Sequence, residues 1–275
     1  MHRWPGRETA SHNRAVVYTG DGEHGEYLYK LVSDKRAGRS LDHGVLHVAR
    51  LYPDGRGEWL PLVYGRGPLI RANGWEDQAD VLLRTRLAAD GAGATPLPPP
   101  GRIAVGSGTT ARQVVCALGA RRAVGCEATG SGSRSRITGV AMPSLAGNLI
   151  RLREHGGDPT ATAFLWSDEE LSGQGLRQIS AEPQTERAPT VRDLQYDAQG
   201  HLWAVLEAEG TPSDELVSVN TASGTTRRVV TARQGAELTA VAVADDNRQI
   251  FVAACTPGAV QERRSVVLSV RRPRA

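Results

Sequence analysis

The chain has 275 residues, enough for one domain with a full core or for an array of repeats. Hydrophobic residues make up 40% and charged residues 23%, which is ordinary globular usage and excludes wholesale disorder. The net charge is +3 and the arginines are spread along the chain, so no electrostatic footprint for nucleic acid is present.

The chain opens with a polar arm, residues 1–14, whose candidate ligands are Glu8 and His12. It has basic residues but no apolar core of a signal peptide, and no later run reaches the roughly 18 apolar residues that a membrane span needs. As written, the sequence predicts a cytoplasmic protein without a membrane span.

The stretch Val16 to Leu62 predicts short antiparallel strands separated by turns rich in Gly and Asp. Apolar positions at three- and four-residue spacing then predict one helix over Trp75 to Ala89, with Leu82, Leu83 and Arg86 on its mainly apolar face. The next segment, Gly91 to Gly101, holds several prolines and is expected to be neither helix nor central strand.

A strand pair is expected at Arg102–Val105 and Gln113–Leu118, followed by a mobile loop over 119–143 that is rich in Gly, Ser and Arg. Residues 168–188 are polar and are expected to be irregular, with a possible short helix. The three cysteines, at 116, 126 and 255, have no spacing that would hold zinc.

Hairpins follow in succession. The strings that predict them are GNLIRLREHGGDPTATAFLWS, VRDLQYDAQGHLWAVLE, DELVSVNTASGTTRRVVT and LTAVAVADDNRQIFVAA, with a last strand at Val266–Val270 and a basic tail, 271–275. Two hairpins in succession make a four-stranded meander, which is one propeller blade. Four to five such units favour a β-propeller over residues 15–270, with one short helix, above a β-sandwich.

An incomplete ring of blades would leave two blade faces exposed. The sequence therefore predicts either a closed ring or self-association through the exposed faces. The aromatic residues Tyr27, Tyr29, Trp59 and Trp203 are expected in the blade cores or between blades.

Five ordered segments resemble the PhoX-type alkaline phosphatases. They read VVYTGDGEHGEYLYKLVSD, LDHGVLHVARLYPDGRGEWLPL, ADVLLRTRLAADGAGATPL, GNLIRLREHGGDPTATAFLW and VRDLQYDAQGHLWAV. The resemblance runs from about Arg7 to Val205 and more loosely to Ala254. It implies a six-bladed propeller, usually exported by the twin-arginine route, that hydrolyses phosphomonoesters with calcium and iron.

The resemblance also implies site residues. Glu8, Asp21 and Glu26 match acidic positions of the family and become candidate metal ligands. The family's Arg-Pro-Glu-Asp motif, however, falls on Pro99, Pro100, Gly101 and Arg102 here, so its arginine and its metal-site glutamate are replaced. The family's N-terminal part has no counterpart, so the chain resembles an N-terminally shortened member.

Two functions remain open on these grounds. One is a metal-dependent phosphatase for small phosphomonoesters, weakened or inactive in this chain, with calcium and iron bound or not. The other is a non-catalytic propeller that serves as a binding module or is a truncated remnant. A carbohydrate- or lactone-directed propeller hydrolase would keep the fold, but no residue specifically supports it.

Overall fold

The computed structural model of the chain describes residues 9–11, 14–22, 25–34, 41–106, 113–119, 145, 148–172, 175–178, 189–207, 213–244, 247–256 and 264–271. Glu8, His12 and all of the expected loop 119–143 except Gly119 lie outside these ranges. No helix in the described ranges is long and apolar enough to cross a membrane.

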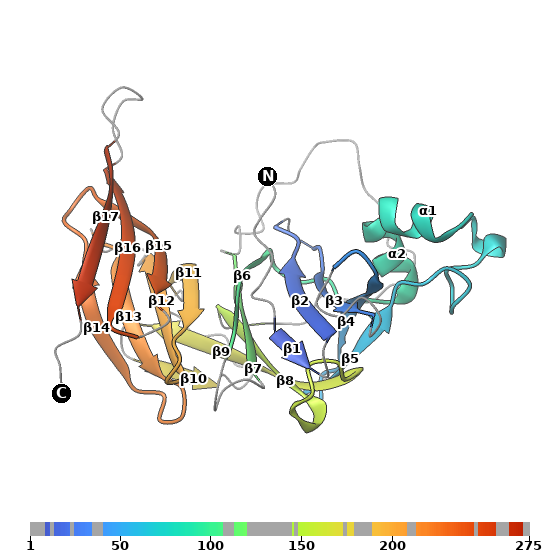
Figure 1. The fold of residues 1–275 in the computed structure, drawn as a ribbon, viewed down its shortest axis with the longest axis horizontal. Coiled ribbons are helices and arrows are strands. Elements are labelled where there is room, and N and C mark those ends of the chain that lie inside the picture. The colour runs from blue at the N-terminus through green and yellow to red at the C-terminus, as the bar shows by residue number, and fades with distance from the viewer. Residues whose placement is uncertain are drawn as a thin grey trace.

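Antiparallel strands dominate the fold and form a ten-stranded, a four-stranded and a three-stranded sheet (Figure 1). The ten-stranded sheet consists of two meanders joined by the pairing of β5 with β9, so four meanders follow one another along the described chain. The first contains β1 (Thr9–Ser11), β2 (Arg14–Gly20), β3 (Leu28–Ser33), β4 (Gly44–Leu51) and β5 (Arg56–Pro61). The second contains β6 (Pro100–Val105), β7 (Gln113–Leu118), β8 (Leu149–Glu154) and β9 (Ala163–Ser172), with β10 (Gly175–Gln178) paired to β9. The third contains β11 (Thr190–Tyr196), β12 (His201–Glu207), β13 (Glu215–Asn220) and β14 (Thr226–Thr231). The fourth contains β15 (Glu237–Val243), β16 (Gln249–Thr256) and β17 (Arg264–Arg271).

The leading strands of the meanders lie side by side. β6 contacts both β2 and β11, and β11 contacts β15. A Cβ atom on Gly20 of β2 would lie 2.5 Å from the carbonyl oxygen of Pro100, so the chain needs glycine at this close approach. Asp193 of β11 accepts a hydrogen bond from the backbone N–H of Val241 at 2.9 Å. This arrangement of first strands is that of consecutive propeller blades and confirms the all-β propeller prediction.

Apolar clusters fill the space between successive meanders, as blade packing requires. Cluster residues shared by the first and second meanders include Tyr18, Trp59, Cys116, Ile150 and Phe164. The second and third meanders share Leu149, Tyr196 and Leu202, and the third and fourth share Trp203, Leu238 and Val252. Tyr27, Tyr29, Trp59 and Trp203 are all buried, as predicted.

Two helices, α1 (Gln78–Leu83) and α2 (Thr85–Ala92), replace the single helix predicted over 75–89. The break is at Arg84, whose backbone (φ −103°, ψ 39°) leaves the helical region, so the apolar periodicity changes face there. The buried helix residues are Val81, Ala88 and Ala89, whereas Leu83 is 86% exposed. The predicted buried face was therefore wrong.

The helices cover the outer face of the first meander, where they pack on Tyr29 and Val48 together with Leu69 and Trp75 (Figure 1). One-turn 3-10 segments lie at η2 (Arg71–Asn73) and η4 (His155–Gly157).

Two predictions about irregular segments were wrong at least in part. The segment 91–101 was expected to contain no helix, but α2 continues to Ala92. Pro100 begins β6, an edge strand with a bulge between Pro100 and Ile103, which agrees with the prediction that this segment is not a central strand. The segment 168–188, expected to be irregular, contains the end of β9 and all of β10. β9 continues because its polar residues Glu169 and Glu170 pair with Arg177 and Gln178 of β10 in antiparallel register.

Candidate functional site

Asp21 and Glu26, the candidate metal ligands within the described residues, lie in the connection between β2 and β3. Glu26 forms a β-bridge with Leu97, and the backbone N–H of Leu97 donates to the Glu26 carbonyl at 2.9 Å. Gly20 lies against Pro100. The backbone on both sides of this connection therefore lies against Leu97 and Pro100, and Pro100 is one of the positions that match the family's Arg-Pro-Glu-Asp motif.

A side chain from α2 joins the two carboxylates. Arg86 donates to both oxygens of Asp21, at 2.6 Å from Nε and 2.7 Å from Nη2. The same Nε lies 3.5 Å from Oε2 of Glu26. The hydrogen bond to Asp21, with the charges of Glu26 and Asp21, raises the pKa of Arg86. Arg86 is thus a fixed positive charge between the predicted ligands.

A buried phenol adjoins this ion-pair cluster. The Tyr29 hydroxyl has no hydrogen-bond partner among the described residues. Burial, followed by the charges of Asp21 and Glu26, raises the pKa of Tyr29. The neighbouring Tyr27 hydroxyl donates to Asp90 at 2.6 Å. Tyr29 therefore stays a neutral phenol next to the two carboxylates.

The residues present do not fit a divalent or trivalent cation held by Asp21 and Glu26. Hard cations require several free oxygen donors, and the guanidinium of Arg86 already uses oxygens of both carboxylates. Across the described ranges, no group of three or more His, Cys, Asp or Glu side chains could hold a metal ion. Glu8, the third candidate, lies outside those ranges.

The segment that matches the motif supplies no carboxylate near this cluster. Arg102 points to the third meander, where its Nε lies 3.7 Å from Oδ1 of Asp193. Burial raises the pKa of Asp193, while the Val241 N–H and the charge of Arg102 oppose that shift. Arg102 therefore connects two blades.

Sequence reasoning missed a second charged cluster, which lies between the first two meanders. Glu154 at the end of β8 accepts hydrogen bonds from Tyr18 (2.7 Å), Lys30 (3.2 Å) and Trp59 (3.1 Å). Lys30 also donates to the carbonyl oxygens of Pro159 and Ala161. The signal in the sequence was Lys30 itself, one of only two lysines, placed between apolar residues in a strand.

Burial determines the ionisation of this pair. It lowers the pKa of Lys30 to about 8, against the favourable charge of Glu154. It also raises the pKa of Glu154, although Lys30, Tyr18 and Trp59 all favour the carboxylate. For each of the two side chains, the cost of removing its charge from water exceeds the attraction of the opposite charge.

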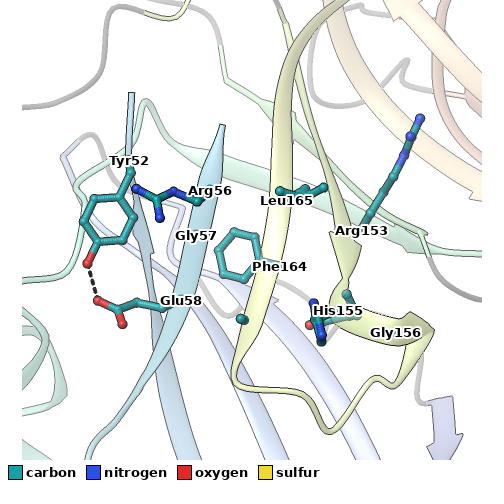
Figure 2. Close-up of a pocket in the computed structure, with 11 residues that line it drawn as sticks. Tyr52, Arg56, Gly57, Glu58, Arg153, His155, Gly156, Phe164 and Leu165 are labelled. Atoms are coloured by element: carbon teal, nitrogen blue, oxygen red, sulfur yellow. Dashed lines mark hydrogen bonds between the residues drawn. The ribbon is translucent and has the colours of Figure 1, made fainter. Parts of the chain in front are cut away.

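A pocket of about 670 Å³ lies nearby, where β5 pairs with β9. Figure 2 shows Tyr52 hydrogen-bonded to Glu58 on one side of Phe164, and His155 on the other. The Phe164 ring lies against Gly57, where no side chain would fit. Neither Asp21, Glu26 nor Arg86 lines this pocket, so it is separate from the predicted site.

Comparison with known proteins links the chain to one family. A family model described as alkaline phosphatase PhoX matches residues 8–258. The solved structure of Pseudomonas fluorescens PhoX in complex with vanadate, a transition state analogue, is 26% identical with a TM-score of 0.70. That match covers 98% of this chain and 52% of the PhoX chain, so this chain spans about half the length of that relative.

More distant structures also match. Kuenenia stuttgartiensis hydrazine synthase has a TM-score of 0.39 at 12% identity, over 93% of this chain and 62% of that one. A putative 6-phosphogluconolactonase from Bacteroides uniformis has a TM-score of 0.30 at 12% identity, over 94% and 85%. No curated protein matches the chain.

Proposed function

This chain belongs to the alkaline phosphatase PhoX family, and from that premise we propose that it is a phosphatase-like propeller with weak or no phosphomonoester hydrolysis. The observation that carries the proposal is the ion pair of Arg86 with Asp21 and Glu26. Both carboxylates serve to fasten α2 to the connection after β2.

Charge explains why this arrangement disfavours metal-assisted hydrolysis. A metal ion promotes phosphate ester cleavage by neutralising the phosphoryl oxygens and activating water, and it must be held by carboxylates that are free to bind it. A cation on the oxygens of Asp21 would lie beside the guanidinium of Arg86, and the two positive charges would repel each other. The motif positions Pro99, Pro100 and Gly101 supply no replacement carboxylate.

The alternative function is an active phosphatase for small phosphomonoesters that uses calcium and iron. The match of the family model over most of the chain favours it. In that case the metal ions need ligands other than Asp21 and Glu26, and Glu8 is the candidate that the sequence offers.

An activity assay separates the two functions. The chain is purified, supplied with calcium and ferric iron, and assayed with p-nitrophenyl phosphate at alkaline pH. We expect little or no turnover above a blank that contains the metals alone. Rapid turnover that rises with protein concentration and disappears with a chelator would support the active phosphatase instead.

A further inference from the structure

The pocket at the pairing of β5 with β9 has no part in the proposed function, and side chains of adjacent strands line it. Arg56 of β5 lies opposite Leu165 of β9, and Leu165 lies opposite Arg153 of β8. Residues directly opposite each other in antiparallel strands share a face of the sheet. The three side chains therefore form one row, and Figure 2 shows Leu165 between the two arginines. Because neighbouring strands are about 4.8 Å apart, the backbones of the arginines are roughly 10 Å apart.

The middle of this row is apolar and held in place. Leu165 is 59% exposed, and Ala163, two positions earlier in β9, is exposed on the same face. Phe164 between them points to the opposite face, where it is buried with its ring centroid 4.9 Å from that of Trp59. The cavity volume of about 670 Å³ lies within the range of roughly 300–1,000 Å³ for small-molecule sites. The pocket therefore has a rigid apolar floor that a ligand can reach.

One positive charge at the edge of this floor is unbalanced. Arg56 is paired with Asp54 at 2.7 Å, and the buried Glu154 with Lys30 at 3.2 Å. Arg153 is exposed, and within the described ranges no residue forms a hydrogen bond or an ion pair with its side chain. A free guanidinium presents a planar fork of N–H donors that matches a carboxylate. This side of the pocket therefore attracts one negatively charged group.

The opposite end of the pocket carries a balanced charge. Tyr52 donates a hydrogen bond to Glu58 at 2.5 Å, and the Arg50 guanidinium lies 4.0 Å from the same carboxylate. Arg50 also lies over the Tyr52 ring, 5.3 Å from its centroid. A ligand that reaches from Arg153 across Leu165 therefore meets no uncompensated charge at this end.

We propose that this pocket binds a small organic carboxylate with a flat aromatic body. The carboxylate pairs with the Arg153 guanidinium, and the body covers Leu165 and Ala163. Removal of the exposed leucine from water favours an apolar body over a polar one. A phosphate monoester would bring about two negative charges to a single unpaired guanidinium, so this pocket is distinct from the substrate site of a phosphatase.

Isothermal titration calorimetry of the full chain tests this ligand class. The probe is 2-naphthoate, and three related compounds each change one feature. The amide 2-naphthamide has the body without the charge, acetate has the charge without the body, and naphthalene-2-phosphonate has the body with two charges. A chelator is present throughout, so the result does not depend on whether the chain hydrolyses phosphomonoesters. We expect saturable binding of 2-naphthoate, and binding of the other three that is weaker by about tenfold or more.

Two variants locate the site. Arg153→Gln removes the unpaired charge, and we expect it to weaken the binding of 2-naphthoate by about tenfold or more. Arg227→Gln is the matched control, because Arg227 is also exposed on a strand, β14, but does not line the pocket. This change should leave the affinity unaltered, and circular dichroism confirms that each variant is folded. The proposal is overturned if 2-naphthoate does not bind saturably, if the two variants bind it equally, or if 2-naphthamide or the phosphonate binds as tightly.

Discussion

Arg86 on α2 donates hydrogen bonds to both carboxylate oxygens of Asp21, at 2.6 and 2.7 Å, across 65 positions of the sequence. The pair fastens the helical segment to the connection between β2 and β3, and Glu26 lies within 3.5 Å of the same guanidinium. The acidic residues that the family resemblance assigned to metal ions thus have an arginine as their partner.

Replacement of Arg86 tests the structural importance of this pair. Arg86→Gln leaves two carboxylates close together without a cation, and we expect a loss of about 1–2 kcal/mol in the free energy of unfolding, because the site is partly exposed. Arg86→Lys keeps the charge but loses the paired geometry, so it should recover only part of that loss. Urea titration of the three proteins measures the difference; equal midpoints would contradict the role given to Arg86.

The buried pair Lys30 and Glu154 predicts strong coupling. Lys30→Met leaves the buried Glu154 with its hydrogen bonds from Tyr18 and Trp59 but without a cation. We expect the free energy of unfolding to fall by about 3–5 kcal/mol. The double change Lys30→Met and Glu154→Gln removes both charges and should recover most of this loss. A double-mutant cycle from urea unfolding measures the coupling, and additive single effects would show that the residues act independently.

Lys30 also predicts a pH dependence. Its pKa falls from 10.5 to about 8 on folding, because burial disfavours the ammonium form. Between these values the unfolded chain binds more protons than the folded chain, so the free energy of unfolding should rise with pH. The measurement runs from pH 8 to about 9.5, below the range in which tyrosines titrate. Relative to Lys30→Met, the natural chain should gain free energy of unfolding over this range. If the free energies of unfolding of the two proteins changed in parallel with pH, the lowered pKa of Lys30 would be refuted.

The close approach of Gly20 to Pro100 predicts the effect of a single methyl group. Gly20→Ala places a Cβ atom 2.5 Å from the Pro100 carbonyl oxygen, which forces β2 and β6 apart. We expect the free energy of unfolding to fall by about 1–3 kcal/mol. The control is Gly91→Ala in α2, where the nearest atom lies at 4.0 Å and alanine favours helix. Thermal unfolding should show a lower midpoint for the first variant and an unchanged or higher midpoint for the second. The opposite order would be inconsistent with the packing of β2 on β6.

Much of the fold could be predicted from local patterns. The hairpins at β8–β9, β11–β12 and β13–β14 each combine alternating apolar residues with a turn that contains Gly or Asn, so their strands are confirmed. The pairing of β5 with β9 joins Gly57 to Phe164 and depends on how two blades meet, which no local pattern records. The helix break at Arg84 was missed because apolar residues recur at three- and four-residue spacing on both sides of it, although the two helices bury different faces.

The site could be predicted only in part. The resemblance singled out Asp21 and Glu26 as metal ligands, and that role stays a prediction; the structure shows that both lie in the connection between β2 and β3 and share the guanidinium of Arg86. Arg86 was assigned to an apolar helix face, and its spacing gives no sign of a partner 65 residues away. Lys30, a lysine between apolar strand residues, was a visible signal that was overlooked. Glu154 was missed because its place beside Lys30 depends on how β3 and β8 pack together.

Metal content tests the central claim, that Asp21 and Glu26 are partners of Arg86 and not metal ligands. The natural chain and the double variant Asp21→Asn, Glu26→Gln are loaded with calcium and ferric iron, dialysed, and measured by elemental analysis, with circular dichroism as the check on folding. The account predicts the same metal content per chain in both proteins. Stoichiometric metal in the natural chain that is lost from the folded double variant would contradict it.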